Sequence, residues 1–211
     1  MTFRDRVDAG RKLAAALEQY RDQNNTIVIA LPRGGVVVGA EVARALALPL
    51  DIVVPRKIGA PGNEEFAIGA ITESGEPVWD RQSVSLTDAS EEYLARTVAR
   101  EQQEAKRRLT TYRGDRPPRN LKDKTIILVD DGIATGLTMA AAIQTIRAEG
   151  AARTILAVPV AATDSIAKLH REVDEVVCLS APQWFGAVGA FYDAFEQTSD
   201  EEVVALLRSH P

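Results

Sequence analysis

Runs of consecutive apolar residues alternate along the chain with segments in which apolar residues recur every three or four positions. The runs are short and rich in Val, Ile and Leu, which is typical of strands buried on both faces of a sheet. They predict strands at residues 26–32, 50–55, 125–130, 154–161 and 175–181. The periodic segments predict helices at residues 3–20, 36–46, 88–112, 137–149 and 164–171, with a last helix after Ser199.

Two further local signals complete the pattern. Thr2 and Asp5 stand at the spacing of a capping box at the start of the first helix. Residues 66–72 and 76–79 predict another strand and its hairpin partner. Strands that alternate with helices predict an α/β fold, in which a doubly wound, mostly parallel sheet is covered by helices on both faces.

The composition fits one globular domain, since 45% of the 211 residues are hydrophobic and 26% are charged. The net charge of −5 and the pI near 5.2 argue against a general nucleic-acid binder. Cys178, the single cysteine, lies in an apolar run and predicts a buried thiol without a disulfide. We expect a cytoplasmic protein, because this compartment is reducing and because no signal peptide or membrane-spanning run is visible.

The segment TIILVDDGIATGLTMAAAI, residues 125–143, predicts an anion-binding turn between a strand and a helix. A helix N-terminus presents unpaired N–H groups and the positive end of the helix dipole. Gly132 and Gly136 let the backbone approach an anion closely, and Thr135 and Thr138 add hydroxyl donors. The segment lacks the Gly-Lys-Ser/Thr of a Walker A loop and the glycine spacing of a dinucleotide fingerprint, so a phosphate monoester is the expected ligand.

Asp130 and Asp131 come directly before this turn, where their carboxylates would repel a phosphate. Their presence makes sense if the ligand carries hydroxyl groups next to its phosphate. A ribose diol offers two donors, and each carboxylate is a strong acceptor. The alternative is an ordinary acidic strand-to-helix turn with a capping threonine.

The stretch IILVDDGIATGLTM resembles the fingerprint of type I phosphoribosyltransferases, enzymes that bind 5-phosphoribosyl-1-pyrophosphate. The resemblance implies that the two aspartates hold the ribose 2- and 3-hydroxyls and that residues 132–138 hold the 5-phosphate. It therefore predicts a substrate-binding segment made of Asp130, Asp131, Gly132, Ile133, Ala134, Thr135, Gly136, Leu137 and Thr138.

Two other segments are similar to parts of the same family. ALPRGGVVVGAEVA resembles the pyrophosphate loop, in which Gly34 and Gly35 expose backbone amides and Arg33 supplies a positive charge. In VVPRKIGAPGNEE, Arg56 and Lys57 resemble a basic pair directed at the pyrophosphate, and GAPGNEE looks like a mobile loop that closes over the reacting centre. The alternative for the basic pair is two solvated charges at a strand end.

Five of the 11 aromatic residues fall within residues 184–195. They either pack on the sheet or form part of a hood whose rings stack on an acceptor base. We expect a single phosphoribosyltransferase domain over residues 1–211, with a core at about 24–180 and a small hood built from residues 57–86, from residues 181–211, or from both.

The resemblance implies transfer of the 5-phosphoribosyl group to a nitrogenous base with release of pyrophosphate. Arg33, Lys57 and Asp131 are the expected catalytic residues, and Mg²⁺ is the expected cofactor, held mainly by the substrate. Ala134 stands where enzymes acting on 6-oxopurines usually carry an aspartate, which favours an adenine-like or uracil-like acceptor. We expect a homodimer that binds neither membranes nor nucleic acid. The alternative function is a non-catalytic regulator of nucleotide metabolism that senses phosphoribosyl pyrophosphate.

Overall fold

The computed structural model describes residues 1–210 and contains one five-stranded parallel sheet with the strand order β2-β1-β6-β7-β8. Its strands are β1 (Thr26–Ala30), β2 (Leu50–Ile52), β6 (Thr125–Val129), β7 (Arg153–Val160) and β8 (Glu175–Ser180). The predicted strands at these places and the α/β fold class are therefore confirmed. The two strands that lead into the acidic turn and into the Arg-Gly-Gly turn, β6 and β1, are neighbours in the sheet.

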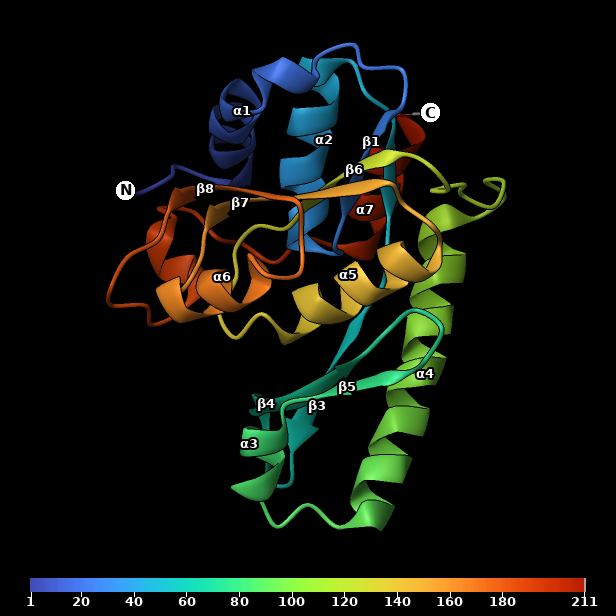
Figure 1. The fold of residues 1–211 in the computed structure, drawn as a ribbon, viewed down its shortest axis with the longest axis vertical. Helices are drawn as coiled ribbons and strands as arrows, with labels where there is room; N and C mark the ends of the chain where they lie inside the picture. Colours follow the sequence, from blue (N-terminus) through green and yellow to red (C-terminus); the bar gives the residue numbers. More distant parts are fainter. Residues whose placement is uncertain (211) are drawn as a thin grey trace.

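Helices cover both faces of this sheet (Figure 1). One face carries α1 (Arg6–Ala16) and α2 (Gly34–Leu46), and the other carries α5 (Leu137–Ala148) and α6 (Thr163–Leu169). Short 3-10 helices follow α1 (η1, Glu18–Tyr20) and precede the C-terminal helix (η2, Val188–Phe191). The last helix, α7 (Asp200–Arg208), packs against α2 and α4.

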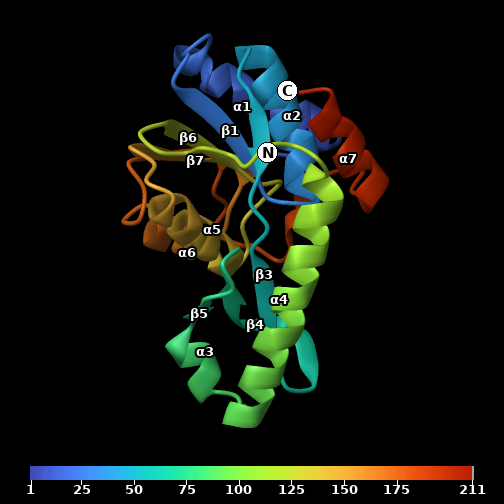
Figure 2. The ribbon, with the colours of Figure 1, turned by 90° about the vertical axis from the view of Figure 1, so that its right-hand side faces the viewer.

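A second sheet extends from one end of the first, as Figures 1 and 2 show. Its three antiparallel strands are β3 (Arg56–Ala60), β4 (Asn63–Ile71) and β5 (Pro77–Trp79), followed by the short helix α3 (Arg81–Ser85). The long helix α4 (Glu91–Arg113) runs from this sheet back to the first one. The second sheet has its own apolar cluster, which includes Ile58, Ile68, Ile71 and Ala105.

Two local predictions differ from the structure. The first helix begins at Arg6 instead of residue 3, because Phe3 is buried against Tyr192 and its backbone pairs with residues 191 and 193. Asp5 alone caps this helix, by accepting a hydrogen bond from the Asp8 amide. The segment GAPGNEE is not a loop throughout: it forms the turn of the β3–β4 hairpin and its flanking strand residues, because the main chain on both sides of Gly62 pairs in a ladder. That it closes over the reacting centre stays a prediction.

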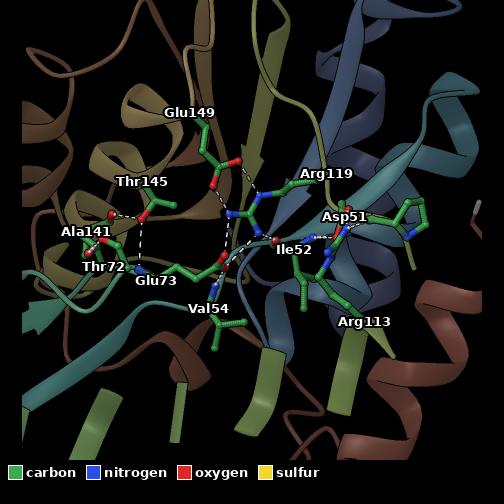
Figure 3. A network of polar contacts seen from close by, with 12 residues as sticks. Asp51, Ile52, Val54, Thr72, Glu73, Arg113, Arg119, Ala141, Thr145 and Glu149 are labelled. Carbon is green, nitrogen blue, oxygen red and sulfur yellow. Dashed lines mark hydrogen bonds and ion pairs between the residues drawn. The ribbon is translucent and has the colours of Figure 1, made fainter. Parts of the chain in front are cut away.

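The guanidinium of Arg119 joins the two sheets (Figure 3). It donates hydrogen bonds to the carbonyl of Ile52 at the end of β2 and to both carboxylate oxygens of Glu73 in the β4–β5 turn. It also pairs with Glu149, just beyond the end of α5. Glu73 in turn accepts a hydrogen bond from the Val54 amide. The Arg119 side chain is only 7% exposed, so these contacts are little screened by water.

The Arg119 contacts predict a large loss of stability when the guanidinium is removed. Arg119→Gln leaves Glu73 and Glu149 as partly buried carboxylates without their shared cation, which typically costs about 3–5 kcal/mol. The matched control is Arg147→Gln on α5, because Arg147 and Glu172 form an ion pair in which both side chains are about half exposed. The control should lose less than about 1 kcal/mol. Urea unfolding followed by circular dichroism measures both values, and equal losses in the two variants would contradict the role given to Arg119.

Candidate functional site

Two loops meet at the carboxyl ends of β1 and β6. The first leads into α2 through Pro32 and Arg33, which are joined by a cis peptide bond, and the second contains the two aspartates. A Cβ atom on Gly34 would lie 2.0 Å from Oδ2 of Asp131, and one on Gly35 would lie 2.7 Å from Oδ1 of Asp130. Any side chain at either glycine would therefore collide with a carboxylate, so the Gly-Gly pair is what allows the loops to touch.

The two aspartates have different surroundings. Asp130 lines a cavity beside the loop of residues 132–138, and its Oδ1 accepts a hydrogen bond from the Asp131 amide. Burial, and the charge of Asp131, raise the pKa of Asp130 well above its usual range. Asp131 points instead to Arg6, whose Nε donates to Oδ2 at 2.7 Å. Burial raises the pKa of Asp131 as well, and Arg6 opposes this rise.

Arg6 is a site residue that the sequence did not reveal, since it lies 125 positions from its partner and belongs to no motif. Its guanidinium stacks 3.8 Å above the ring of Phe195 and donates to the carbonyl of Glu196. Nearby, the Tyr192 hydroxyl donates to the backbone carbonyl of Asp131. The first helix and the C-terminal segment thus brace the acidic turn from outside the cavity.

The loop after the aspartates ends at the N-terminus of α5. Gly136 occupies the cap position with a φ of 79°, a conformation that favours glycine, and no side chain caps this helix. Ile133 is fixed by two backbone hydrogen bonds to residues around the end of β7, and Ser165 donates to the Ala134 carbonyl. The loop is therefore held in place while the first amides of α5 keep their capacity to bind an anion.

A cavity of about 250 Å³ lies over this loop. It is lined by Lys57, Ala67, Asp130, Gly132, Ile133, Ala134, Thr135, Gly136, Thr138, Met139 and Val188. The 132–138 loop, the second sheet and the segment before α7 each contribute residues to this lining. Of the predicted site residues, the structure brings Lys57 together with Asp130 and with all of residues 132–138 except Leu137, the first residue of α5.

Two predicted basic residues point away from this cavity. Arg33 lies 3.7 Å from Oδ1 of Asp200, which also accepts a hydrogen bond from Tyr112. Arg56 pairs with Glu101 of α4, and Glu101 is 7% exposed. Arg56 and Lys57 are consecutive in β3, so their side chains lie on opposite faces of the strand. A role for Arg33 and Arg56 at the pyrophosphate stays a prediction, since both are paired with carboxylates here.

Some aromatic residues of the segment 184–195 are buried and others are exposed to solvent. Tyr192 is buried in a cluster with Phe3, whereas the Trp184 side chain is 91% exposed. Val188 is the residue of this segment that lines the cavity over the loop. The packing interpretation is therefore confirmed for Tyr192, and a role of the segment toward an acceptor base stays a prediction.

The side chains that the structure describes include no cluster of three or more His, Cys, Asp or Glu residues suited to hold a metal ion. Among the described residues that line the loop cavity, Asp130 is the one with a carboxylate. In the same described part of the chain, no helix is both long enough and apolar enough to span a bilayer.

Residues 3–196 match the family described as the phosphoribosyl transferase domain. A protein of Mycobacterium tuberculosis, whose name assigns it provisionally as a phosphoribosyl transferase, is 44% identical over 99% of this chain. The chain spans about half the length of that relative, since the match covers 47% of it.

Among solved structures, TT1426 of Thermus thermophilus is 45% identical, with a TM-score of 0.81 over 100% of this chain and 99% of its own. A Neisseria gonorrhoeae protein, solved with bound ppGpp, shares the fold alone at 14% identity and a TM-score of 0.52, covering 99% of this chain and 98% of its own. Because the family model matches residues 3–196, nearly the whole chain, the chain belongs to the phosphoribosyl transferase family.

Proposed function

We propose that the protein transfers the 5-phosphoribosyl group from phosphoribosyl pyrophosphate to a nitrogenous base and releases pyrophosphate. The observation that carries this proposal is the cavity in which Asp130, Lys57 and the uncapped N-terminus of α5 face one another. A sugar phosphate with a charged leaving group presents a matching set of a diol, a phosphate monoester and a pyrophosphate.

In this arrangement the amides and hydroxyls of residues 134–138 bind the 5-phosphate, because the helix N-terminus favours an anion. Asp130 accepts hydrogen bonds from the ribose hydroxyls. Asp131 can join it only if the carboxylate turns away from Arg6. Lys57 faces the pyrophosphate, together with backbone amides at the start of α2.

The chain's contribution to the reaction is positioning and electrostatic stabilisation, since a base nitrogen is itself the nucleophile. Negative charge grows on the pyrophosphate as its bond to the sugar breaks, so Lys57 should interact more strongly with the transition state than with bound substrate. Positive charge grows on the sugar, where the Asp130 carboxylate is close.

Magnesium is part of the proposal, and the donor set fits a substrate-held ion. Among the residues that the structure describes, the cavity offers one carboxylate, that of Asp130, so pyrophosphate and sugar oxygens would have to complete the coordination shell. When bound, the ion would neutralise part of the charge on the leaving group.

For the acceptor, we propose an adenine-like or uracil-like base in preference to a 6-oxopurine. Ala134 supports this choice, because it lines the cavity without offering a carboxylate to the base.

A non-catalytic sensor of phosphoribosyl pyrophosphate is the second candidate. The pairing of Arg33 with Asp200 and of Arg56 with Glu101 favours it, since both cations are engaged away from the cavity. The transferase proposal does not require Arg33 or Arg56 at the pyrophosphate if Lys57 and the backbone amides stabilise its charge.

Pyrophosphate release separates the two candidates. The wild type, with Mg²⁺ and phosphoribosyl pyrophosphate, should release pyrophosphate with adenine or uracil in a panel that also contains hypoxanthine and guanine. Lys57→Gln should lower the maximal rate roughly a hundredfold to a thousandfold, as typically follows the loss of one stabilising donor. The control is Lys106→Gln, an exposed residue of α4, which should keep the wild-type rate. Tight binding of the sugar phosphate with no release in the presence of any base would favour the sensor.

Asp130→Asn should have two effects: it should weaken the binding of phosphoribosyl pyrophosphate, and it should stabilise the folded protein. Loss of charge-assisted hydrogen bonds of about 1.5–3 kcal/mol corresponds to about 10- to 150-fold weaker phosphoribosyl pyrophosphate binding. The raised pKa of Asp130 means that the folded state holds its proton more tightly than the unfolded state. Wild-type stability therefore falls as pH rises from the ordinary carboxyl pKa, about 3.9, through the raised one.

The asparagine variant lacks this loss, so its melting temperature should exceed that of the wild type by more at pH 8 than at pH 5. Calorimetric binding and thermal unfolding test the two halves. If the variant binds phosphoribosyl pyrophosphate as tightly as the wild type, Asp130 does not contact the sugar. If the variant melts at a lower temperature than the wild type at pH 8, burial of the Asp130 carboxylate does not destabilise the fold.

A further inference from the structure

A large cavity lies at the opposite end of the five-stranded sheet from the loops that follow β1 and β6. Its volume is about 760 Å³, within the range of small-molecule sites. The amino ends of β1, β2 and β6 form its floor. The last residues of α4, the segment that follows it (residues 114–120) and α7 form its rim. Figure 2 shows α7 beside the upper end of α4.

The lining of this cavity carries more positive than negative charge. Two of its arginines are already paired, Arg113 with Asp51 and Arg119 with Glu73 and Glu149. Three further cations also line the cavity: Arg116, Lys124 and Arg208. Within residues 1–210 these three form no ion pair with a carboxylate, and Asp115 is the other acidic residue of the lining. The unneutralised charge predicts a ligand that is an anion.

Arg116 is incompletely satisfied. Its Nη2 donates to the backbone carbonyls of Leu50 and His210, while its Nη1 is buried with no hydrogen-bond acceptor among the described residues. A buried guanidinium nitrogen without a partner is unfavourable, and such groups in native proteins call for an explanation. An oxyanion beside Arg116 would supply the missing acceptor, since guanidinium binds carboxylate and phosphate groups well.

The rest of the lining is apolar. Pro49, Leu50, Pro117, Val204 and Leu207 present hydrocarbon surface to the same cavity. A small inorganic ion would leave this surface in contact with water, whereas an organic molecule with one charged end would cover it.

We propose that this cavity is a second ligand site, which binds an organic anion with an apolar body. The anion lies at Arg116, Lys124 and Arg208, and the apolar body lies against the prolines and against α7. The site is separate from the cavity over the 132–138 loop, because the two lie at opposite ends of the parallel strands. It does not depend on the proposed transferase activity.

The test uses the aromatic sulfonate 1-anilinonaphthalene-8-sulfonate and its uncharged counterpart N-phenyl-1-naphthylamine. The full chain should bind one sulfonate molecule, measured by fluorescence, at least about 10-fold more tightly than the uncharged compound. Arg116→Gln should weaken sulfonate binding at least about 10-fold and leave binding of the uncharged compound unchanged. Since Arg116 also holds two backbone carbonyls, the double variant Lys124→Gln with Arg208→Gln repeats the test with side chains that do not hold the backbone in this way.

Two controls make the result specific. Arg171→Gln removes one positive charge from an exposed position after α6, and Lys57→Gln removes one from the loop cavity. Both should bind the sulfonate as the wild type does. The proposal is overturned if the Arg116 and double variants bind it as tightly as the wild type. It is also overturned if the uncharged compound binds equally well, or if the control variants weaken binding to the same extent.

Discussion

The close approach of the Gly34–Gly35 backbone to the Asp130 and Asp131 carboxylates is the constraint on which the site depends. A Cβ atom at either glycine would lie well inside the contact distance of a carboxylate oxygen. The contact forms because β1 and β6 are adjacent and parallel, so their carboxyl ends deliver both loops to one edge of the sheet. The N-termini of α2 and α5 follow these two loops.

The two aspartates beside this contact face different surroundings. Asp130 faces the cavity, while Asp131 faces Arg6, which is held in turn by Phe195 and Glu196. Arg6, near the start of the sequence, and residues 195 and 196, near its end, therefore hold the turn that follows β6, the central strand of the sheet. An ion pair between side chains that are 12% and 15% exposed fixes the turn strongly, because removing one partner would leave an uncompensated charge in a buried place.

The parts of this molecule that local pattern determines could be predicted from the sequence. Buried strands read as apolar runs, and the turn after β6 is a contiguous motif, so the structure has both at the predicted residues. Strand β3 could not be predicted, because Arg56 and Lys57 interrupt any apolar pattern. Side-chain direction was also beyond prediction, since Arg33 and Arg56 are drawn to Asp200 and Glu101, carboxylates far away in the sequence.

Binding of phosphoribosyl pyrophosphate to the Gly35→Ala variant tests directly whether the site depends on the contact between the two loops. The added methyl group would displace Asp130, so calorimetry should show at least about 10-fold weaker binding while circular dichroism shows a folded protein. Gly186→Ala is the control, because a Cβ atom there meets no atom within 4 Å, and it should bind as the wild type does. Wild-type affinity in a folded Gly35→Ala variant would contradict the dependence of the site on the contact between the two loops.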